Sequence, residues 1–254
     1  MVGNLLLRGM LVGVIAGLIA FAFARTFGEP QVDLAIAFEE QVSKAEAQVQ
    51  GKVEESEPEL VSRETQAGLG LLTGILVYGA AIGGLFALVF ACLYGRLGNL
   101  GARETAALLA LAGFLGVVLI PFIKYPANPP AVGDPETIAI RTQLFSIMLV
   151  ISLATLAFAV ILARGLWARY GGWNATVIAG LAALVIIIIA QYALPDINEV
   201  PEQFSASVLW RFRVASLGIH VILWTVLGLL FGMLTERSLA DRSTRLFSLR
   251  SATR

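Results

Sequence analysis

The sequence is poor in the residues on which many soluble active sites depend. It has one cysteine, Cys92, and one histidine, His220, among 254 residues. A single cysteine excludes an intrachain disulfide and any zinc site built from several thiolates. A single histidine excludes a metalloprotease site with a pair of histidines. Charged residues make up only 14% of the chain, against about a quarter in a soluble domain of this size. These shortages argue against a soluble enzyme.

Motifs of catalysis are missing as well. No segment matches the phosphate-binding pattern G-x-x-x-x-G-K-[ST], and neither G-x-S-x-G nor H-E-x-x-H occurs. The apolar stretches lack the acidic residues that an intramembrane aspartyl protease needs. The net charge is zero, so bulk charge does not indicate nucleic acid as a partner. We therefore predict no catalytic residues, no enzyme and no nucleic-acid binding.

Long apolar runs are what the chain has instead. Its residues are 57% hydrophobic, and the mean hydropathy is +0.81. A helix needs about 20 mostly apolar residues to cross the hydrocarbon core, and strands cannot span it singly. Six stretches qualify: 5–24, 67–93, 105–123, 143–163, 174–194 and 214–234. We predict an all-α membrane protein, one integral domain of about six transmembrane helices, with three hairpins that hint at an internal repeat.

The first stretch has an alternative interpretation. Arg8 and the small residues of Ala22-Phe23-Ala24 resemble the start and the cleavage site of a signal peptide. However, the run is long, and Gly9, Gly13 and Gly17 recur at four-residue spacing, as on a helix face that packs closely. Similar pairs follow later in the chain, at Gly70/Gly74, Gly79/Gly83 and Gly228/Gly232. The glycines favour a retained, tightly packed helix.

The distribution of charge predicts the orientation. The N-terminus, 94–104, 164–173 and the tail from 235 hold most of the basic residues but only three acids, Glu104, Glu236 and Asp241. Short basic loops stay in the cytoplasm. Both termini are therefore predicted to be cytoplasmic, and 25–66, 124–142 and 195–213 to face outward. This orientation places the chain in the cytoplasmic (inner) membrane of the cell.

The first outward segment, 25–66, is predicted to be an acidic loop. Within it, Ala35, Phe38 and Val42 recur at helical spacing, so an amphipathic helix is expected over about 32–50. Residues 51–60 are expected to be a mobile acidic connection.

Candidate site residues gather on the outward side. Carboxylates with one imidazole suit divalent cations from Mg²⁺ to Co²⁺ and Ni²⁺. The candidate metal ligands are Glu29, Asp33, Glu39, Glu40, Asp134, Glu199 and, inside the last span, His220. Several basic residues lie in the segments predicted to face outward, where the charge bias disfavours them, so we expect them to pair with acidic residues. The candidate gate or ion-pair residues are Lys124, Glu136, Arg141, Asp196, Arg211 and Arg213. For each set a purely structural role is the alternative.

Several segments resemble the CbtA family, whose members are described as probable cobalt transporter subunits. The similarity lies in 27–30, 33–40, 60–63, 68–90, 121–137, 194–202 and 209–217, and the stretches 124–136 and 198–217 are the most specific. The resemblance implies cobalt uptake linked to cobalamin synthesis, with Co²⁺ as the transported ion, and a small single-span partner of the CbtB type. The chain departs from the expected pattern in one respect, since 25–66 contains no histidine. Carboxylates or a partner's histidines would then have to capture the metal.

Three functions follow for comparison. The first is a divalent metal permease subunit, in which the outer acids attract the cation and Asp134, Glu199 and His220 pass it inward. The second is a subunit that transports nothing and binds a partner or membrane lipids, with a homo-oligomer as a further expectation. The third is an intramembrane enzyme that acts on a lipid. We favour the first.

Overall fold

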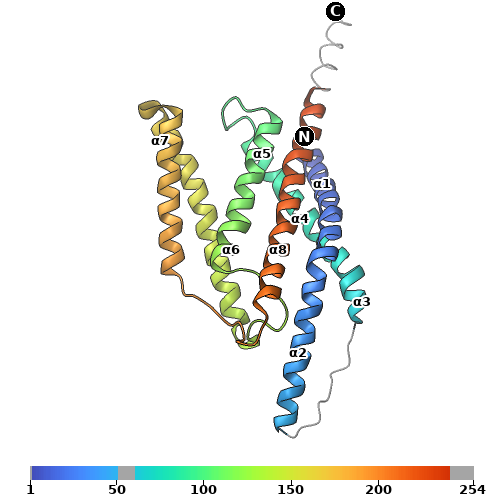
Figure 1. Ribbon diagram of the computed structural model, residues 1–254. Coiled ribbons are helices and arrows are strands. Elements are labelled where there is room, and N and C mark those ends of the chain that lie inside the picture. Colours follow the sequence, from blue (N-terminus) through green and yellow to red (C-terminus); the bar gives the residue numbers. More distant parts are fainter. Residues whose placement is uncertain (1, 51–60, 241–254) are drawn as a thin grey trace, which may run out of the picture. The chain divides into compact units, whose positions relative to one another are not determined.

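The computed structural model describes residues 2–50 and 61–240, and every regular element in these two ranges is helical. The predicted connection 51–60 lies outside the described residues. The elements are α1 (Val2–Phe23), η1 (Ala24–Gly28), α2 (Glu29–Gln50), α3 (Arg63–Thr65), η2 (Gln66–Gly70), α4 (Leu71–Leu93), α5 (Ala102–Gly113), η3 (Phe114–Leu119), α6 (Ile120–Lys124), η4 (Pro135–Thr137), α7 (Ile138–Ala193), α8 (Ala206–Val226) and η5 (Leu227–Phe231) (Figure 1).

Five helices in the described ranges are long and apolar enough to cross a membrane: Val2–Ala45, Arg63–Leu93, Ala102–Lys124, Pro135–Ala193 and Ala206–Ala240. The fourth contains two of the predicted spans. It is interrupted at Gly171, whose φ of 74° and ψ of 165° are not helical. The two arms of α7 run in opposite directions on either side of this point (Figure 1). The predicted class, an all-α membrane protein, is confirmed, and the six predicted apolar stretches are helical except for Leu194 at the end of the fifth.

The segment after the first span differs from the expected loop. The helix does not end at Gly28-Glu29-Pro30, because α1 continues through the π-helical turn η1 directly into α2. Proline lacks an N–H and crowds the carbonyl four residues earlier, and a π-helical turn relieves both problems by widening the helix. Residues 32–50 are therefore helical, but as an extension of the first span.

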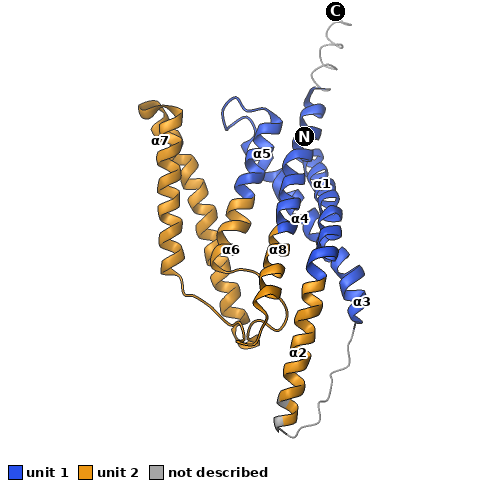
Figure 2. Cartoon of the chain, in the orientation of Figure 1, with its two compact units in different colours: residues 1–29, 57–113, 218–254 blue, residues 30–56, 114–217 orange. Residues whose placement is uncertain are grey.

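The chain divides into two compact units (Figure 2). Unit 1 comprises residues 1–29, 57–113 and 218–254, and unit 2 comprises 30–56 and 114–217. The internal repeat of three hairpins and the single membrane domain stay predictions.

Close backbone contact between α1 and α4 organises unit 1. A Cβ placed on Gly13 would lie 2.0 Å from the carbonyl oxygen of Gly79, and one on Gly9 would lie 2.2 Å from that of Gly83. The two helices are antiparallel, because Gly9 lies next to Gly83 and the later residue Gly13 lies next to the earlier residue Gly79. The glycine pairs of α1 and of Gly79/Gly83 therefore mediate packing as predicted. A Cβ on Gly74 would meet nothing within 4 Å, so that glycine makes no such contact.

The last helix packs against α5 in the same way. A Cβ on Gly228 would lie 2.6 Å from the Cβ of Ala110, and one on Gly232 would lie 3.0 Å from the Cβ of Ala106. An aromatic cluster closes the unit, with the ring centroid of Phe231 5.3 Å from that of Phe86 and 5.1 Å from that of Phe90. Edge-to-face aromatic packing at these distances adds stability beyond the burial of area.

Unit 2 has a different arrangement. The buried Ser152 of α7 donates a hydrogen bond to the carbonyl oxygen of Gly116, which ties the first arm of α7 to η3. A separate apolar cluster contains the buried residues Ala35, Val132 and Phe204, and the rings of Phe38 and Phe204 meet edge to face at 5.1 Å. This cluster joins α2 to two loops that carry most of the candidate site.

Candidate functional site

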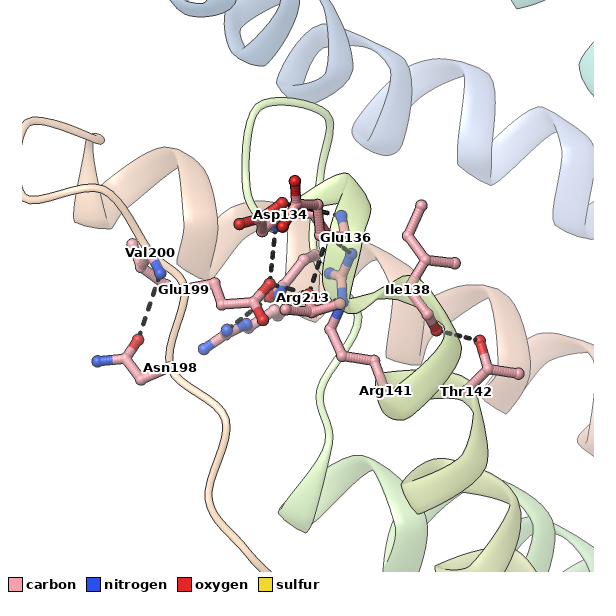
Figure 3. Close-up of polar contacts among 11 residues, drawn as sticks. Asp134, Glu136, Ile138, Arg141, Thr142, Asn198, Glu199, Val200 and Arg213 are labelled. Atoms are coloured by element: carbon pink, nitrogen blue, oxygen red, sulfur yellow. Dashed lines mark hydrogen bonds and ion pairs between the residues drawn. The ribbon is translucent and has the colours of Figure 1, made fainter.

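The polar residues of unit 2 gather where its helices end. The chain leaves α6 at Lys124 and cannot continue as a helix through Pro126, Pro129 and Pro130. It returns at Asp134, whose carboxylate accepts a hydrogen bond of 2.8 Å from the amide of Glu136 and so caps η4. The loop before α8 supplies Asn198 and Glu199. We call the residues Asn128, Asp134, Arg141, Asn198, Glu199 and Arg213 the mouth cluster (Figure 3).

Glu199 is the most firmly held member of the mouth cluster. Its Oε2 accepts a hydrogen bond of 2.8 Å from the amide of Asp134, and the same oxygen lies 3.5 Å from Nε of Arg141. The pKa of Glu199 lies below its ordinary value, first because of the hydrogen bond with the Thr137 side chain, then because of the Asp134 amide and Arg141. The carboxylate is therefore ionised at neutral pH.

The two arginines of the cluster have different partners. Arg141 donates a hydrogen bond of 3.1 Å to the carbonyl oxygen of Asp134, in addition to its ion pair with Glu199. Arg213 donates to two neutral oxygens, Oδ1 of Asn128 at 2.8 Å and the carbonyl of Ala127 at 3.3 Å. Both described partners of Arg213 thus leave its positive charge uncompensated.

A cavity of about 360 Å³ lies within the cluster. Its polar lining consists of Tyr125, Asn128, Arg141, Thr142, Asn198, Glu199 and Arg213, and its apolar lining of Pro126, Val132, Ile138, Phe145, Ile197 and Val200. Two guanidinium groups and one carboxylate give the lining a net charge of about +1 at neutral pH.

Lys124 forms a second polar contact next to the mouth cluster. Its side chain is only 6% exposed, and its Nζ donates to the carbonyl oxygen of Gln191 at 2.7 Å and pairs with the carboxylate of Asp196. The neighbouring Tyr125 donates from its hydroxyl to the carbonyl of Pro195 at 2.8 Å. These bonds connect the end of α6 to the segment that follows α7.

The structure brings together two of the predicted metal ligands, Asp134 and Glu199, but through the backbone amide of the former. Glu29 is paired with Arg63 and lies in unit 1. Asp33, Glu39 and Glu40 are exposed on α2, and Glu40 lies 3.5 Å from Lys44. No group of three or more His, Cys, Asp or Glu that could hold a metal ion occurs in the ranges 2–50 and 61–240. Whether these residues bind metal stays a prediction.

His220 lies in unit 1. Its ring faces that of Tyr78 edge-on, with 6.0 Å between centroids, and its Nδ1 is buried without a hydrogen-bond partner among the described residues. The indole N–H of Trp224, one turn later, is likewise buried without a hydrogen-bond partner among the described residues. The structure thus places His220 in apolar packing.

The predicted gate and ion-pair residues separate into two groups. Lys124, Arg141 and Asp196 take part in ion pairs. Arg211 and Glu136 are exposed, and Arg213 binds neutral oxygens. Sequence reasoning missed the roles of Thr137 and Gln191, because neither a hydroxyl nor an amide next to a membrane span carries a charge signal. It also missed the pair Glu29–Arg63, although an arginine ends each outward segment.

Comparison with protein families gives one finding. The family model described as probable cobalt transporter subunit (CbtA) matches residues 2–236. This range covers the mouth cluster and all but the last four residues of the five apolar helices. Comparisons with curated proteins and with solved structures gave no match.

Proposed function

The chain belongs to the CbtA family of probable cobalt transporter subunits, and from this premise we propose that it moves Co²⁺ inward across the cytoplasmic membrane, in support of cobalamin synthesis. The observation that carries the proposal is the match over residues 2–236, which includes the outward loops as well as the apolar helices. Hydropathy alone would not produce agreement across 124–136 and 198–217. The word subunit in the family description implies a complex, and a single-span CbtB-like protein is the partner that we propose.

Exposed carboxylates provide the first step of this function. Glu39 and Glu40 on α2 are exposed, and acidic surfaces raise the local concentration of hydrated cations. Glu29 is already paired with Arg63, so a cation must displace this arginine to reach the Glu29 carboxylate.

Glu199 is the proposed contact at the mouth. Its carboxylate stays ionised, and carboxylate oxygens suit Co²⁺. The nearby guanidinium of Arg141 repels a cation, so Co²⁺ reaches Oε2 by displacing Arg141 from the 3.5 Å contact. In such an exchange, the ion pair between Arg141 and Glu199 opens when Co²⁺ binds and forms again when Co²⁺ leaves. One carboxylate holds a divalent ion weakly, which suits passage rather than storage.

Cobalt uptake by cells tests the proposal. Cells that lack the gene are complemented with the wild-type chain, with Glu199→Gln or with Glu202→Gln, and radioactive cobalt uptake is measured under cobalt limitation. Glu202 is the matched control, because it is an exposed carboxylate in the same loop that does not line the cavity. We expect the wild type and Glu202→Gln to restore uptake and Glu199→Gln to reduce it several-fold. Uptake that does not depend on the gene would refute transport.

A second candidate is a subunit that transports nothing and binds a partner. The specific observation in its favour is that the described residues bring no three metal-ligating side chains together. Purified chain in proteoliposomes separates the two functions. Co²⁺ influx that falls with Glu199→Gln, with the chain alone or with the partner present, supports a permease, and influx that this variant leaves unchanged supports the second candidate.

The proposed residues for cation contact are Glu29, Asp33, Glu39, Glu40, Asp134, Glu199 and His220.

A further inference from the structure

The cavity of the mouth cluster has an excess of positive charge. Arg141 enters it from α7 and Arg213 from α8, whereas Glu199 is the one acidic residue in its described lining. Glu199 already pairs with Arg141, so the charge of Arg213 has no counterpart among the lining residues. An uncompensated charge that is partly removed from water is unfavourable, and an anion in the cavity would compensate it.

Donor groups remain available for such an anion. Arg213 uses Nε and one terminal nitrogen for its two hydrogen bonds, and its other terminal nitrogen has no hydrogen-bond partner among the described residues. Nε of Arg141 is buried and faces Glu199 at 3.5 Å, so an anion in the cavity would meet the terminal nitrogens of this guanidinium. Two guanidinium groups can bind a phosphate through several parallel hydrogen bonds.

Part of the cavity lining is apolar and exposed. Ile138 and Phe145 flank Arg141 at three and four residues on one face of α7, and both line the cavity. Ile138 is 55% exposed and Phe145 is 38% exposed. A small inorganic anion makes no favourable contact with apolar side chains at the edge of a cavity. An amphiphile does, because its polar group binds in the cleft and its apolar part packs against those side chains.

The place of the cavity in the fold indicates which amphiphile. Arg141 lies in the first turn of α7, where a long apolar helix begins, and Tyr125 follows the last residue of another apolar helix. Helix ends of this kind lie at the level of the lipid headgroups. An arginine flanked by exposed apolar side chains at this level is in reach of both the phosphate and the upper acyl chains.

We infer that this cavity binds the phosphodiester headgroup of an anionic phospholipid, held between Arg141 and Arg213, with an acyl chain along Ile138 and Phe145. A lipid with one net negative charge neutralises the lining. The lipid occupies the cavity that Glu199 lines and uses Arg141 there, but its binding does not require Co²⁺ and is measured in its absence.

Lipid binding to the purified full-length chain in detergent tests the inference. Native mass spectrometry and the thermal midpoint are recorded with phosphatidylglycerol, with phosphatidylcholine and with soluble glycerol phosphate. We expect phosphatidylglycerol to bind at least tenfold more tightly than phosphatidylcholine and to raise the midpoint. Equal binding of the two lipids would overturn the inference. A full effect of glycerol phosphate would also overturn it, because a soluble anion would then be the ligand.

Variants locate the site. Arg141→Gln and Arg213→Lys should each weaken phosphatidylglycerol at least tenfold, and Phe145→Ser should weaken the lipid but not any residual effect of glycerol phosphate. Arg169→Gln is the matched control, because Arg169 is an arginine on α7 that does not line the cavity. If Arg141→Gln does not fold, Arg141→Lys retains the charge and loses the planar donor geometry. Unchanged selectivity in folded Arg213→Lys and Arg141→Lys would refute the site.

Discussion

Replacement of Gly13 by alanine is the sharpest test of the packing in unit 1. The new Cβ would lie 2.0 Å from the carbonyl oxygen of Gly79 and 2.7 Å from its carbonyl carbon. Carbon and a carbonyl oxygen rarely approach closer than about 3.3 Å, so α1 and α4 must separate by roughly 1.3 Å at this point. A gap of this size forfeits about a quarter to a half of the dispersion energy of the affected contacts.

The magnitude follows from two opposing effects. Overpacking of this kind costs about 1–3 kcal/mol, and the higher helix propensity of alanine returns up to about 1 kcal/mol. We therefore expect Gly13→Ala to lower the free energy of unfolding by about 1–2 kcal/mol. Gly74→Ala is the matched control on α4, because its Cβ would meet nothing within 4 Å. The control should be neutral or stabilising by up to about 1 kcal/mol.

The assay is the thermal midpoint of the purified protein, followed by tryptophan fluorescence and by size-exclusion chromatography after heating. A change of 1 kcal/mol shifts the midpoint of a chain of this size by about 2–4 °C. The two variants should therefore differ by roughly 2–12 °C, with Gly13→Ala the lower. If both variants melt within a degree of each other, the backbone contact between α1 and α4 is not a source of stability.

Three further predictions concern single contacts. Gly113→Ala would place a Cβ 2.1 Å from the Trp224 ring and should lower the thermal midpoint. The additional substitution Trp224→Leu should restore part of the loss, and no restoration would mean that the contact is absent. Lys124→Met should lower the free energy of unfolding in denaturant by about 1–2 kcal/mol, because it removes the buried member of the ion pair with Asp196. Asp196→Asn should lower it by less than about 0.5 kcal/mol, because the Asp196 side chain is 92% exposed. Equal losses of stability in the two variants would contradict this. The lowered pKa of Glu199 means that its ionised form stabilises the fold above the ordinary value of 4.5, and that this contribution is lost as the pH falls through the folded-state value. The stability difference between wild type and Glu199→Gln should therefore shrink below pH 4.5, and a difference that grows on acidification would be inconsistent with it.

The membrane helices were predictable because hydrophobicity over about 20 residues is a strong and local signal. The glycine spacing of α1 also predicted a close contact, although sequence spacing could not identify α4 as the partner. Gly70/Gly74 has the same spacing, but a Cβ on Gly74 would meet nothing within 4 Å and one on Gly70 would meet only the nearby carbonyl oxygen of Thr65 at 3.4 Å, so the motif permits close approach of another helix without requiring it.

The segment after the first span was harder to predict. Hydropathy falls sharply at Gly28-Glu29-Pro30, and this fall suggested the end of the helix. Polarity, however, reports the exit from lipid rather than the end of helical structure. The residues that follow are rich in Glu, Ala and Gln, which favour helix, so the backbone continues once η1 has accommodated Pro30.

The candidate site was predictable in composition but not in pairing. Charge bias identified Arg141, Arg211 and Arg213 as residues that need acidic partners, and Glu199 was one of several acids that could supply them. Arg141 and Glu199 are far apart in the sequence, however, and no local pattern specifies that they meet. The partner of Arg213, Asn128, is neutral, so a search for opposite charges could not find it. Such contacts depend on the loop path, which Ala131 and Gly133 set through φ angles of 64° and 123°.

The reversal of α7 at Gly171 leads to a prediction of membrane topology that a labelling experiment can test. The φ of 74° and ψ of 165° of Gly171 lie in a region that is essentially restricted to glycine, so a reversal of the helix is compatible with this residue and costs about 1–3 kcal/mol with any other. If each arm of α7 crosses the membrane once, the number of crossings is even, and we predict both termini to lie on the same side. We predict that side to be the cytoplasm, because the basic residues Arg164 and Arg169 lie in α7 shortly before Gly171.

Since Cys92 is the one cysteine of the sequence, a Cys92→Ser background allows single cysteines to be placed at will. A cysteine at Ala168 and one at Asn4 should react with a membrane-impermeant thiol reagent only in inverted vesicles, whereas one at Asn198 should react in intact spheroplasts. Labelling of positions 168 and 198 from the same side would mean that α7 does not turn back across the membrane after Gly171. The outward placement of Glu199, and with it the proposed entry of Co²⁺, would then be wrong.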